Sequence, residues 1–141
     1  MECSNLKPKI FCQVRRIYVA HTPEEEVRQS FISHWISTKG YPGSLIAAEV
    51  SLASLCPFKV KVPNRRLDLV FFTQSTVGLK PLMLVECKAD SASEAALRQL
   101  IGYNRFASAP YLCLASSKEK RYGAFSEGGW SFSDREPAIL N

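Results

Sequence analysis

The sequence predicts a mixed α/β (α+β) fold in the order α-β-β-β-α-β, followed by a C-terminal hairpin. Three observations predict it. Residues 22–39 show the pattern of an amphipathic helix with a clear start. Residues 66–73 and 81–88 are nearly unbroken apolar runs, as in buried strands, and residues 91–107 show a second helix pattern before a short strand at 110–115. Because no repeat, low-complexity tract or linker interrupts the chain, we expect one domain over its whole length.

The first helix has strong local signals at both ends. It follows a loosely alternating segment, residues 9–20, which is expected to form an edge strand or hairpin. Thr22 is a suitable N-cap, Pro23 fits the first helical position, and Glu25 lies at the capping-box distance. The helix is expected to end near Gly40, which serves as its C-cap.

The remaining segments complete the predicted order. Residues 44–52 are a candidate first strand, and residues 56–63 an extended link. Residues 74–80 are expected to form the turn between the second and third strands. After the fourth strand, residues 122–125 and 130–132 flank a glycine turn and predict a hairpin.

Composition limits the classes of protein to consider. The chain has 141 residues, 46% of them hydrophobic, and a net charge of +5, which keeps nucleic acid among the expected partners. No apolar run approaches the roughly 20 residues that span a bilayer, and no signal-like segment is seen, so we expect no membrane association and a cytoplasmic location. The five cysteines, which include Cys3, are odd in number and lack a CxxC pair, which argues against a disulfide framework or a zinc knuckle.

Three charged residues stand inside predicted strands and suggest chemistry. Asp68 lies between Leu67 and Leu69, and Glu86 and Lys88 end the next apolar run. Since strand side chains alternate, Glu86 and Lys88 share one face, which Asp68 reaches if the register matches. Two converging carboxylates suit Mg²⁺, with Mn²⁺ as a substitute, and Lys88 could orient the attacking water. The alternative is a solvated Glu86–Lys88 ion pair beside a polar strand end, because ExK triplets are common by chance.

The second predicted helix carries a further candidate. Gln99 and Tyr103 lie four residues apart and so share one helix face. A glutamine there could hold a water or a phosphate oxygen, although a polar residue at the edge of the core would look the same.

Several motifs together resemble a known family. They fall in order along residues 18–115: YVA (18–20), TPEEEVRQ (22–29), KGYPGSLIAAE (39–49), RRLDLV (65–70), PLMLVECKA (81–89) and QLIGYN (99–104). The chain resembles small proteins similar to the N-terminal nuclease domain of type I restriction enzyme R subunits. It departs from the family after the fourth strand, where residues 111–120 lack the expected Thr-Asn-Gly turn.

The resemblance implies a PD-(D/E)XK restriction-endonuclease-like fold, with a central mixed sheet flanked by helices. It implies that Asp68 and Glu86 hold a divalent metal, that Lys88 stands beside the nucleophilic water, and that Gln99 matches the family's helix glutamine. It also implies that a helix glutamate is among the catalytic residues.

Which glutamate completes the site stays open. The motif alignment favours Glu25, whereas the helical phase favours Glu24, and Glu49 on the first strand also matches a family glutamate. The expected function is therefore a Mg²⁺-dependent endonuclease acting on nucleic acid, with DNA the expected substrate, as a stand-alone relative of the family domain. A homodimer would supply two active sites for a double-strand cut. The alternative is a catalytically inactive nucleic-acid-binding or protein-interaction module that retains the fold.

Overall fold

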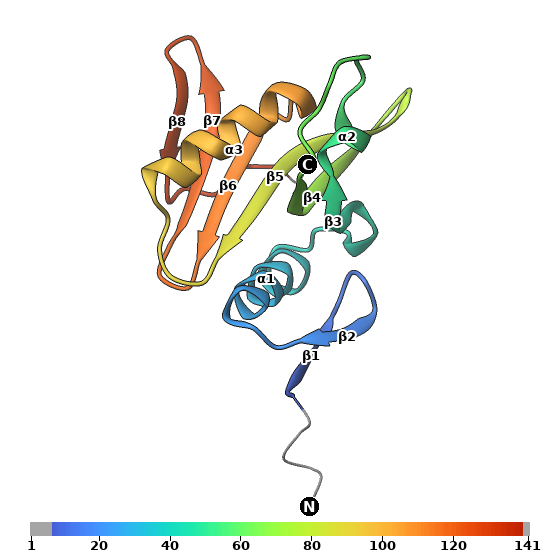
Figure 1. The fold of residues 1–141 in the computed structure, drawn as a ribbon, viewed down its shortest axis with the longest axis vertical. Coiled ribbons are helices and arrows are strands. Elements are labelled where there is room, and N and C mark those ends of the chain that lie inside the picture. The colour runs from blue at the N-terminus through green and yellow to red at the C-terminus, as the bar shows by residue number, and fades with distance from the viewer. Residues whose placement is uncertain (1–6, 140–141) are drawn as a thin grey trace, which may run out of the picture.

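The computed structural model describes residues 7–139, which form helices packed on strands (Figure 1). In chain order they are β1 (Lys9–Cys12), β2 (Ile17–Ala20), α1 (Pro23–Ser33), a π-helical turn (His34–Thr38), a 3₁₀ turn (Gly43–Leu45), β3 (Ile46–Ser51), α2 (Leu52–Leu55), β4 (Arg66–Ser75), β5 (Gly78–Lys88), α3 (Glu94–Ala107), β6 (Tyr111–Ser116), β7 (Lys120–Ser126) and β8 (Gly129–Ser133). The predicted succession of strands, the two main helices and the C-terminal hairpin is present. The short helix α2 between β3 and β4 was not predicted, and it takes Leu52 from the end of the expected first strand.

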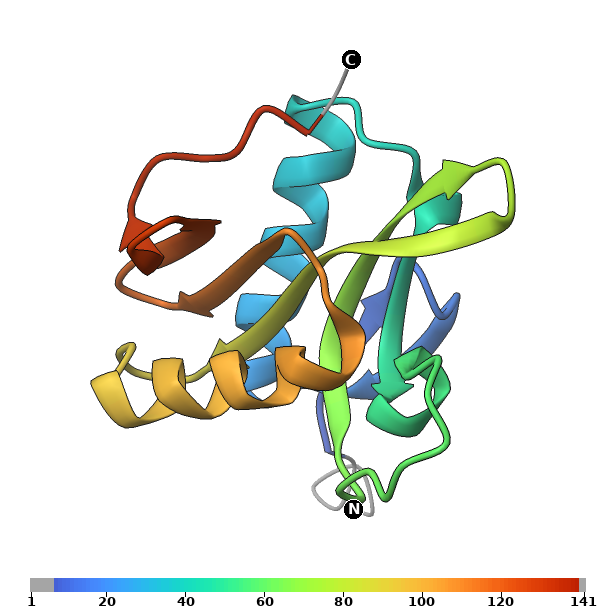
Figure 2. The same ribbon diagram turned by 90° about the horizontal axis from the view of Figure 1, so that it is seen from above.

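A six-stranded mixed sheet forms the centre of the molecule. Its strands follow chain order, β3-β4-β5-β6-β7-β8. All neighbours are antiparallel except β5 and β6, which run parallel and are joined by the crossover helix α3. The β4–β5 hairpin extends beyond the rest of the sheet (Figure 2). Strands β1 and β2 pair only with each other, as an antiparallel hairpin beside α1.

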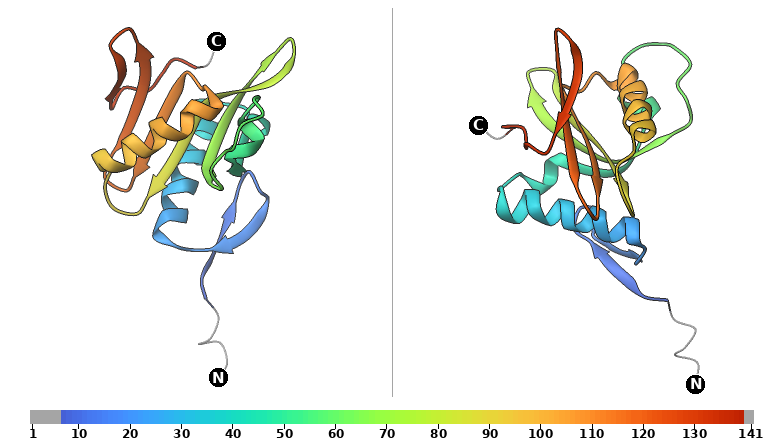
Figure 3. Two further views of the ribbon diagram at one scale, coloured as in Figure 1. Left: turned by 45° about the horizontal axis from the view of Figure 1, so that its top comes forward. Right: turned by 90° about the vertical axis from the view of Figure 1, so that its left-hand side faces the viewer.

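Helices cover both faces of the sheet, with α1 on one face and α3 on the other (Figure 3). The α1 face is a core that includes the fully buried Phe31, Trp35 and Phe71. The α3 face is a second core in which α2 and α3 pack on β4, β5 and β6 through residues such as Leu84 and Leu100. Two buried layers explain why β4 and β5 read as continuous apolar runs in the sequence.

Helix α1 begins as the sequence predicts. Thr22 accepts a hydrogen bond from the backbone N–H of Glu25 at 3.1 Å, and Pro23 occupies the first turn. The last part of the helix differs in its winding, because residues 34–38 continue as a π-helical turn. The helical segment ends close to the expected position, but its C-cap is Lys39 and not the predicted Gly40. Gly40 follows with a positive φ of 75°, a conformation that favours glycine.

The turn between β4 and β5 is shorter than the expected 74–80, because β4 continues to Ser75 and β5 begins at Gly78. Pro81 within β5 lies opposite a register shift between Phe71 and Phe72. A bulge of this kind accommodates a residue that has no N–H for the ladder.

Two further expectations concern membranes and cysteines. Among residues 7–139, no helix combines the length and the apolar character needed to cross a membrane. Cys12, Cys56, Cys87 and Cys113 are free thiols in the part of the chain that the structure describes, whereas Cys3 lies outside it.

Candidate active site

The candidate site lies where β4 and β5 stop pairing through their backbones. The antiparallel register runs as far as Leu69 opposite Val85. Beyond that pair, side-chain oxygens bridge the two strands. The backbone N–H of Asp68 donates to Glu86 Oε1 at 3.1 Å, and the N–H of Cys87 donates to Asp68 Oδ2 at 2.7 Å. Each carboxylate therefore reaches across to the other strand, and the two acids lie side by side.

The two carboxyl groups disturb each other electrostatically. Burial, followed by the negative charge of Asp68, raises the pKa of Glu86 to about 8, against the opposing effects of the Asp68 amide and the Lys88 ammonium. Burial also raises the pKa of Asp68, although the Cys87 amide and the Arg28 guanidinium counteract it. Two half-buried carboxylates this close cannot both ionise without cost, and a divalent cation between them would remove that cost.

Lys88 is placed beside this pair. It lies two residues after Glu86 on β5, so the two side chains leave the same face of the strand. Lys88 is half-buried, and its backbone is in register with Ser116 of β6. Its positive charge is near enough to Glu86 to oppose the rise in the pKa of that carboxyl group.

Arg28 of α1 connects the carboxylates that face it. It is buried, and its Nη2 donates to Glu49 Oε1 at 2.9 Å and lies 3.6 Å from Asp68 Oδ1. Its Nη1 donates to the backbone carbonyl of Asp68 at 3.4 Å, and its Nε lies 3.5 Å from Glu25 Oε2. One guanidinium thus fixes three acidic side chains from three different elements.

Glu49 has an unusual backbone. Its φ is 57°, in the left-handed region, although it is not glycine and lies within β3. The register with β4 pairs Ala48 with Leu69 and Val50 with Leu67, and skips Glu49. This conformation costs about 1–3 kcal/mol, and such strain clusters at functional sites.

The two candidate helix glutamates differ in their surroundings. Glu25 is buried, and its carboxylate accepts two hydrogen bonds from Arg15 Nη2, both at 3.0 Å, and one from Gln29 Nε2 at 2.8 Å. Glu24 is exposed, and its negative charge contributes to the raised pKa of Asp68. The carboxylate of Glu25 is thus hydrogen-bonded within the fold. The carboxylate of Glu24 is solvent-exposed and close enough to Asp68 to affect its pKa.

Gln99 has no side-chain hydrogen bond to this cluster. It is exposed on α3, and its side chain makes no hydrogen bond to any other residue between 7 and 139. Tyr103, one turn later, accepts a hydrogen bond from Arg65 Nε at 3.1 Å. The structure brings together Asp68, Glu86 and Lys88, whereas Gln99 stays a prediction from the sequence.

Sequence reasoning did not identify Arg15 and Gln29, which bind Glu25. The pattern held only a partial signal for them, because Gln29 follows Glu25 by four residues and so shares its helix face. Arg15 comes from the β1–β2 hairpin, and no local pattern links it to α1.

The donor set limits which cations the site could hold. No group of three or more His, Cys, Asp or Glu side chains within residues 7–139 is arranged to hold a metal ion. Two carboxylates are nevertheless a sufficient protein contribution for Mg²⁺, which keeps several waters and takes its other oxygens from substrate phosphates. The residues present therefore fit a hard divalent cation and do not fit a closed structural zinc site.

Comparison with protein families gives one match. The model of the type I restriction enzyme R protein N terminus matches residues 23–132. This span runs from the first residue of α1 into β8 and contains Asp68, Glu86 and Lys88. Comparison with curated proteins and with solved structures gave no match.

Proposed function

We infer the function from the family to which the chain belongs, that of the type I restriction enzyme R protein N terminus. We propose that the protein is a metal-dependent nuclease with the PD-(D/E)XK fold and that it hydrolyses phosphodiester bonds in DNA. The observation that carries this proposal is the adjacency of Asp68 and Glu86 where β4 and β5 separate. A structural ion pair would not require two mutually repelling acids there.

Asp68 and Glu86 would hold the cation, with Mg²⁺ the proposed ion and Mn²⁺ a substitute. When bound, it would neutralise charge on the scissile phosphate and acidify a water. Lys88 would orient that water and stabilise the negative charge that develops on the phosphate. Arg28 would hold Asp68 in place through the contacts it makes with that residue.

We assign the third acidic position to Glu24. Glu25 would serve the fold, since Arg15 and Gln29 already bind its carboxylate. Glu24→Gln should lower cleavage and leave the thermal midpoint unchanged, whereas Glu25→Gln should lower the midpoint because the half-buried Arg15 loses its carboxylate partner. A thermal midpoint that falls for Glu24→Gln and stays unchanged for Glu25→Gln would reverse the assignment.

Cleavage of plasmid and single-stranded DNA in Mg²⁺ or Mn²⁺ tests the function. Asp68→Ala and Lys88→Ala should each lower the rate by about 100-fold or more. Lys80→Ala, at the other end of β5, is the matched control for loss of a lysine and should cleave normally. Nucleic-acid binding without cleavage in either metal would make the protein a binding module and would refute the nuclease.

A further inference from the structure

Positive charge is concentrated in one surface segment. Between Val50 and Leu67 the chain has four basic residues and no acidic residue, a local charge of +4 in a protein whose net charge is +5. The four are Lys59, Lys61, Arg65 and Arg66. We call residues 56–66, the connection from α2 to the first residue of β4, the basic loop.

The cations of the basic loop have no acidic partner among the described residues. All four are exposed, and none forms a salt bridge with any residue between 7 and 139. Most other arginines near the site are paired, as Arg15 and Arg28 are with Glu25. Unpaired cations in a row attract a polyanion rather than a single carboxylate.

The same loop exposes apolar side chains between its lysines. Phe58 is 64% exposed and Val60 56% exposed, and they alternate in sequence with Lys59 and Lys61. Cations interleaved with an exposed aromatic ring are typical of surfaces that hold a nucleic-acid strand, because bases stack on the ring while the cations follow the phosphates.

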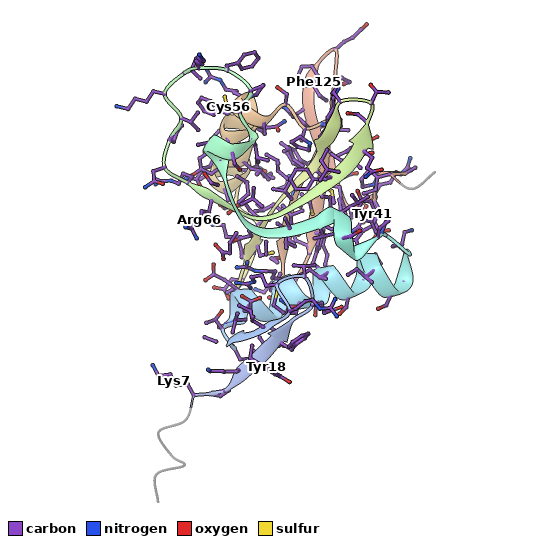
Figure 4. All side chains as sticks on the ribbon, turned by 90° about the vertical axis from the view of Figure 1, so that its right-hand side faces the viewer. Lys7, Tyr18, Tyr41, Cys56, Arg66 and Phe125 are labelled. Atoms are coloured by element: carbon purple, nitrogen blue, oxygen red, sulfur yellow. The ribbon has the colours of Figure 1, made fainter. Side chains whose placement is uncertain are left out.

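The second half of the basic loop is attached to the folded body. The N–H of Leu52 donates to the carbonyl of Arg65 at 2.9 Å, Arg65 Nε donates to Tyr103 at 3.1 Å, and Val62 packs against the α3-side core. The loop between the labelled Cys56 and Arg66 projects into solvent (Figure 4). An anchored base with a projecting tip keeps the cations available at a small ordering cost.

The basic loop leads directly into the candidate active site. Arg66 opens β4 only two residues before Asp68, and its backbone is in register with Ser51 of β3. A strand whose phosphates follow the loop would therefore approach the carboxylate pair along a continuous path.

We propose that the basic loop binds the sugar–phosphate backbone of a nucleic-acid strand and guides it to Asp68 and Glu86, with Phe58 as a stacking surface. This inference rests on the proposed nuclease function for its choice of ligand. Binding measured without metal separates it from catalysis.

Fluorescence anisotropy with mixed-sequence single- and double-stranded DNA in EDTA tests the loop. Lys59→Gln/Lys61→Gln should weaken binding by about tenfold and reduce the slope of log affinity against log salt by about 1.4 on single strands. Lys80→Gln/Arg135→Gln removes the same charge from exposed residues outside the loop and should leave the slope near that of the wild type. Phe58→Ala should weaken single-strand binding by about fivefold or more, and Val77→Ala, which also alters an exposed apolar side chain, should not.

Each outcome bears on the proposal. Equal affinity and slope for the loop variant and its control would overturn it, as would no binding by the wild type at low salt. If binding depends on the loop but the wild-type protein does not cleave DNA in Mg²⁺ or Mn²⁺, the proposed role of the loop is supported and the nuclease function is refuted. If the loop variant cleaves DNA with the KM of the wild type, the nuclease function is supported and the proposed role of the loop is overturned.

Discussion

Replacing Glu86 with glutamine should stabilise the metal-free protein, and more at alkaline pH than at acid pH. Burial and the neighbouring Asp68 raise the pKa of Glu86 from the ordinary 4.5 to about 8. Between these two values the folded protein binds more protons than the unfolded chain, so stability is lost as the pH rises through this range. The glutamine has no charge to bury, and its oxygen can still accept the hydrogen bond from the Asp68 N–H.

The size of the effect follows from the pKa difference. A rise in the pKa of Glu86 from 4.5 to about 8 lowers the free energy of unfolding at alkaline pH by at most about 5 kcal/mol, at about 1.4 kcal/mol per pH unit. Glu86 is only half-buried and titrates together with Asp68, so we expect about 2 kcal/mol of extra stability for the variant at about pH 8.5. At about pH 5 the difference should nearly vanish, because Glu86 is then protonated in the folded protein.

Urea unfolding in EDTA at the two pH values measures this difference. Glu127→Gln, an exposed glutamate in the β7–β8 turn, is the control for loss of one negative charge and should show no comparable gain. A stabilisation that is the same at both pH values, or larger in acid, would refute the electrostatic account of the site.

Three further substitutions test the contacts of Arg28 at the site and the packing of β7 elsewhere in the fold. Arg28→Gln should cost about 3 kcal/mol in urea unfolding, because the acidic side chains that it pairs with lose their cation. Tyr122→Phe should cost about 1 kcal/mol in the same assay, since the buried Trp35 Nε1 loses the hydroxyl to which it donates at 3.2 Å. Gly123→Ala should lower the thermal midpoint, at a cost of about 2 kcal/mol, because a Cβ there would overlap the ring of Phe132 on β8. Wild-type stability in any of these variants would contradict the packing assigned to it.

The sequence predicted the features that depend on local patterns. Thr22 and Pro23 start α1 as expected, and the apolar run that ends in Glu86 and Lys88 became a central strand. The turn after β4 was overestimated, because turn-forming residues such as Gln74 and Ser75 continue the ladder once β5 pairs with them. Propensity is a weak guide wherever a neighbouring strand supplies the hydrogen bonds.

The features that depend on tertiary contacts could not be derived from pattern alone. The closeness of Asp68 to Glu86 depends on register, and the alternation of side chains says nothing about register. The difference between Glu24 and Glu25 depends on Arg15, which comes from a hairpin ten residues earlier in the chain. The pattern predicts residues 56–63 only as an extended link, since dispersed cations look like ordinary surface in a sequence. That the four cations are exposed and form no salt bridge is seen only in the structure.

The most direct test of the central claim is anomalous diffraction from crystals soaked with Mn²⁺. The account predicts a single strong peak at coordination distance, about 2.0–2.2 Å, from oxygens of both Asp68 and Glu86, and its loss in Asp68→Ala crystals. Saturating Mn²⁺ that leaves no peak between these carboxylates, or a peak that persists without Asp68, would contradict it.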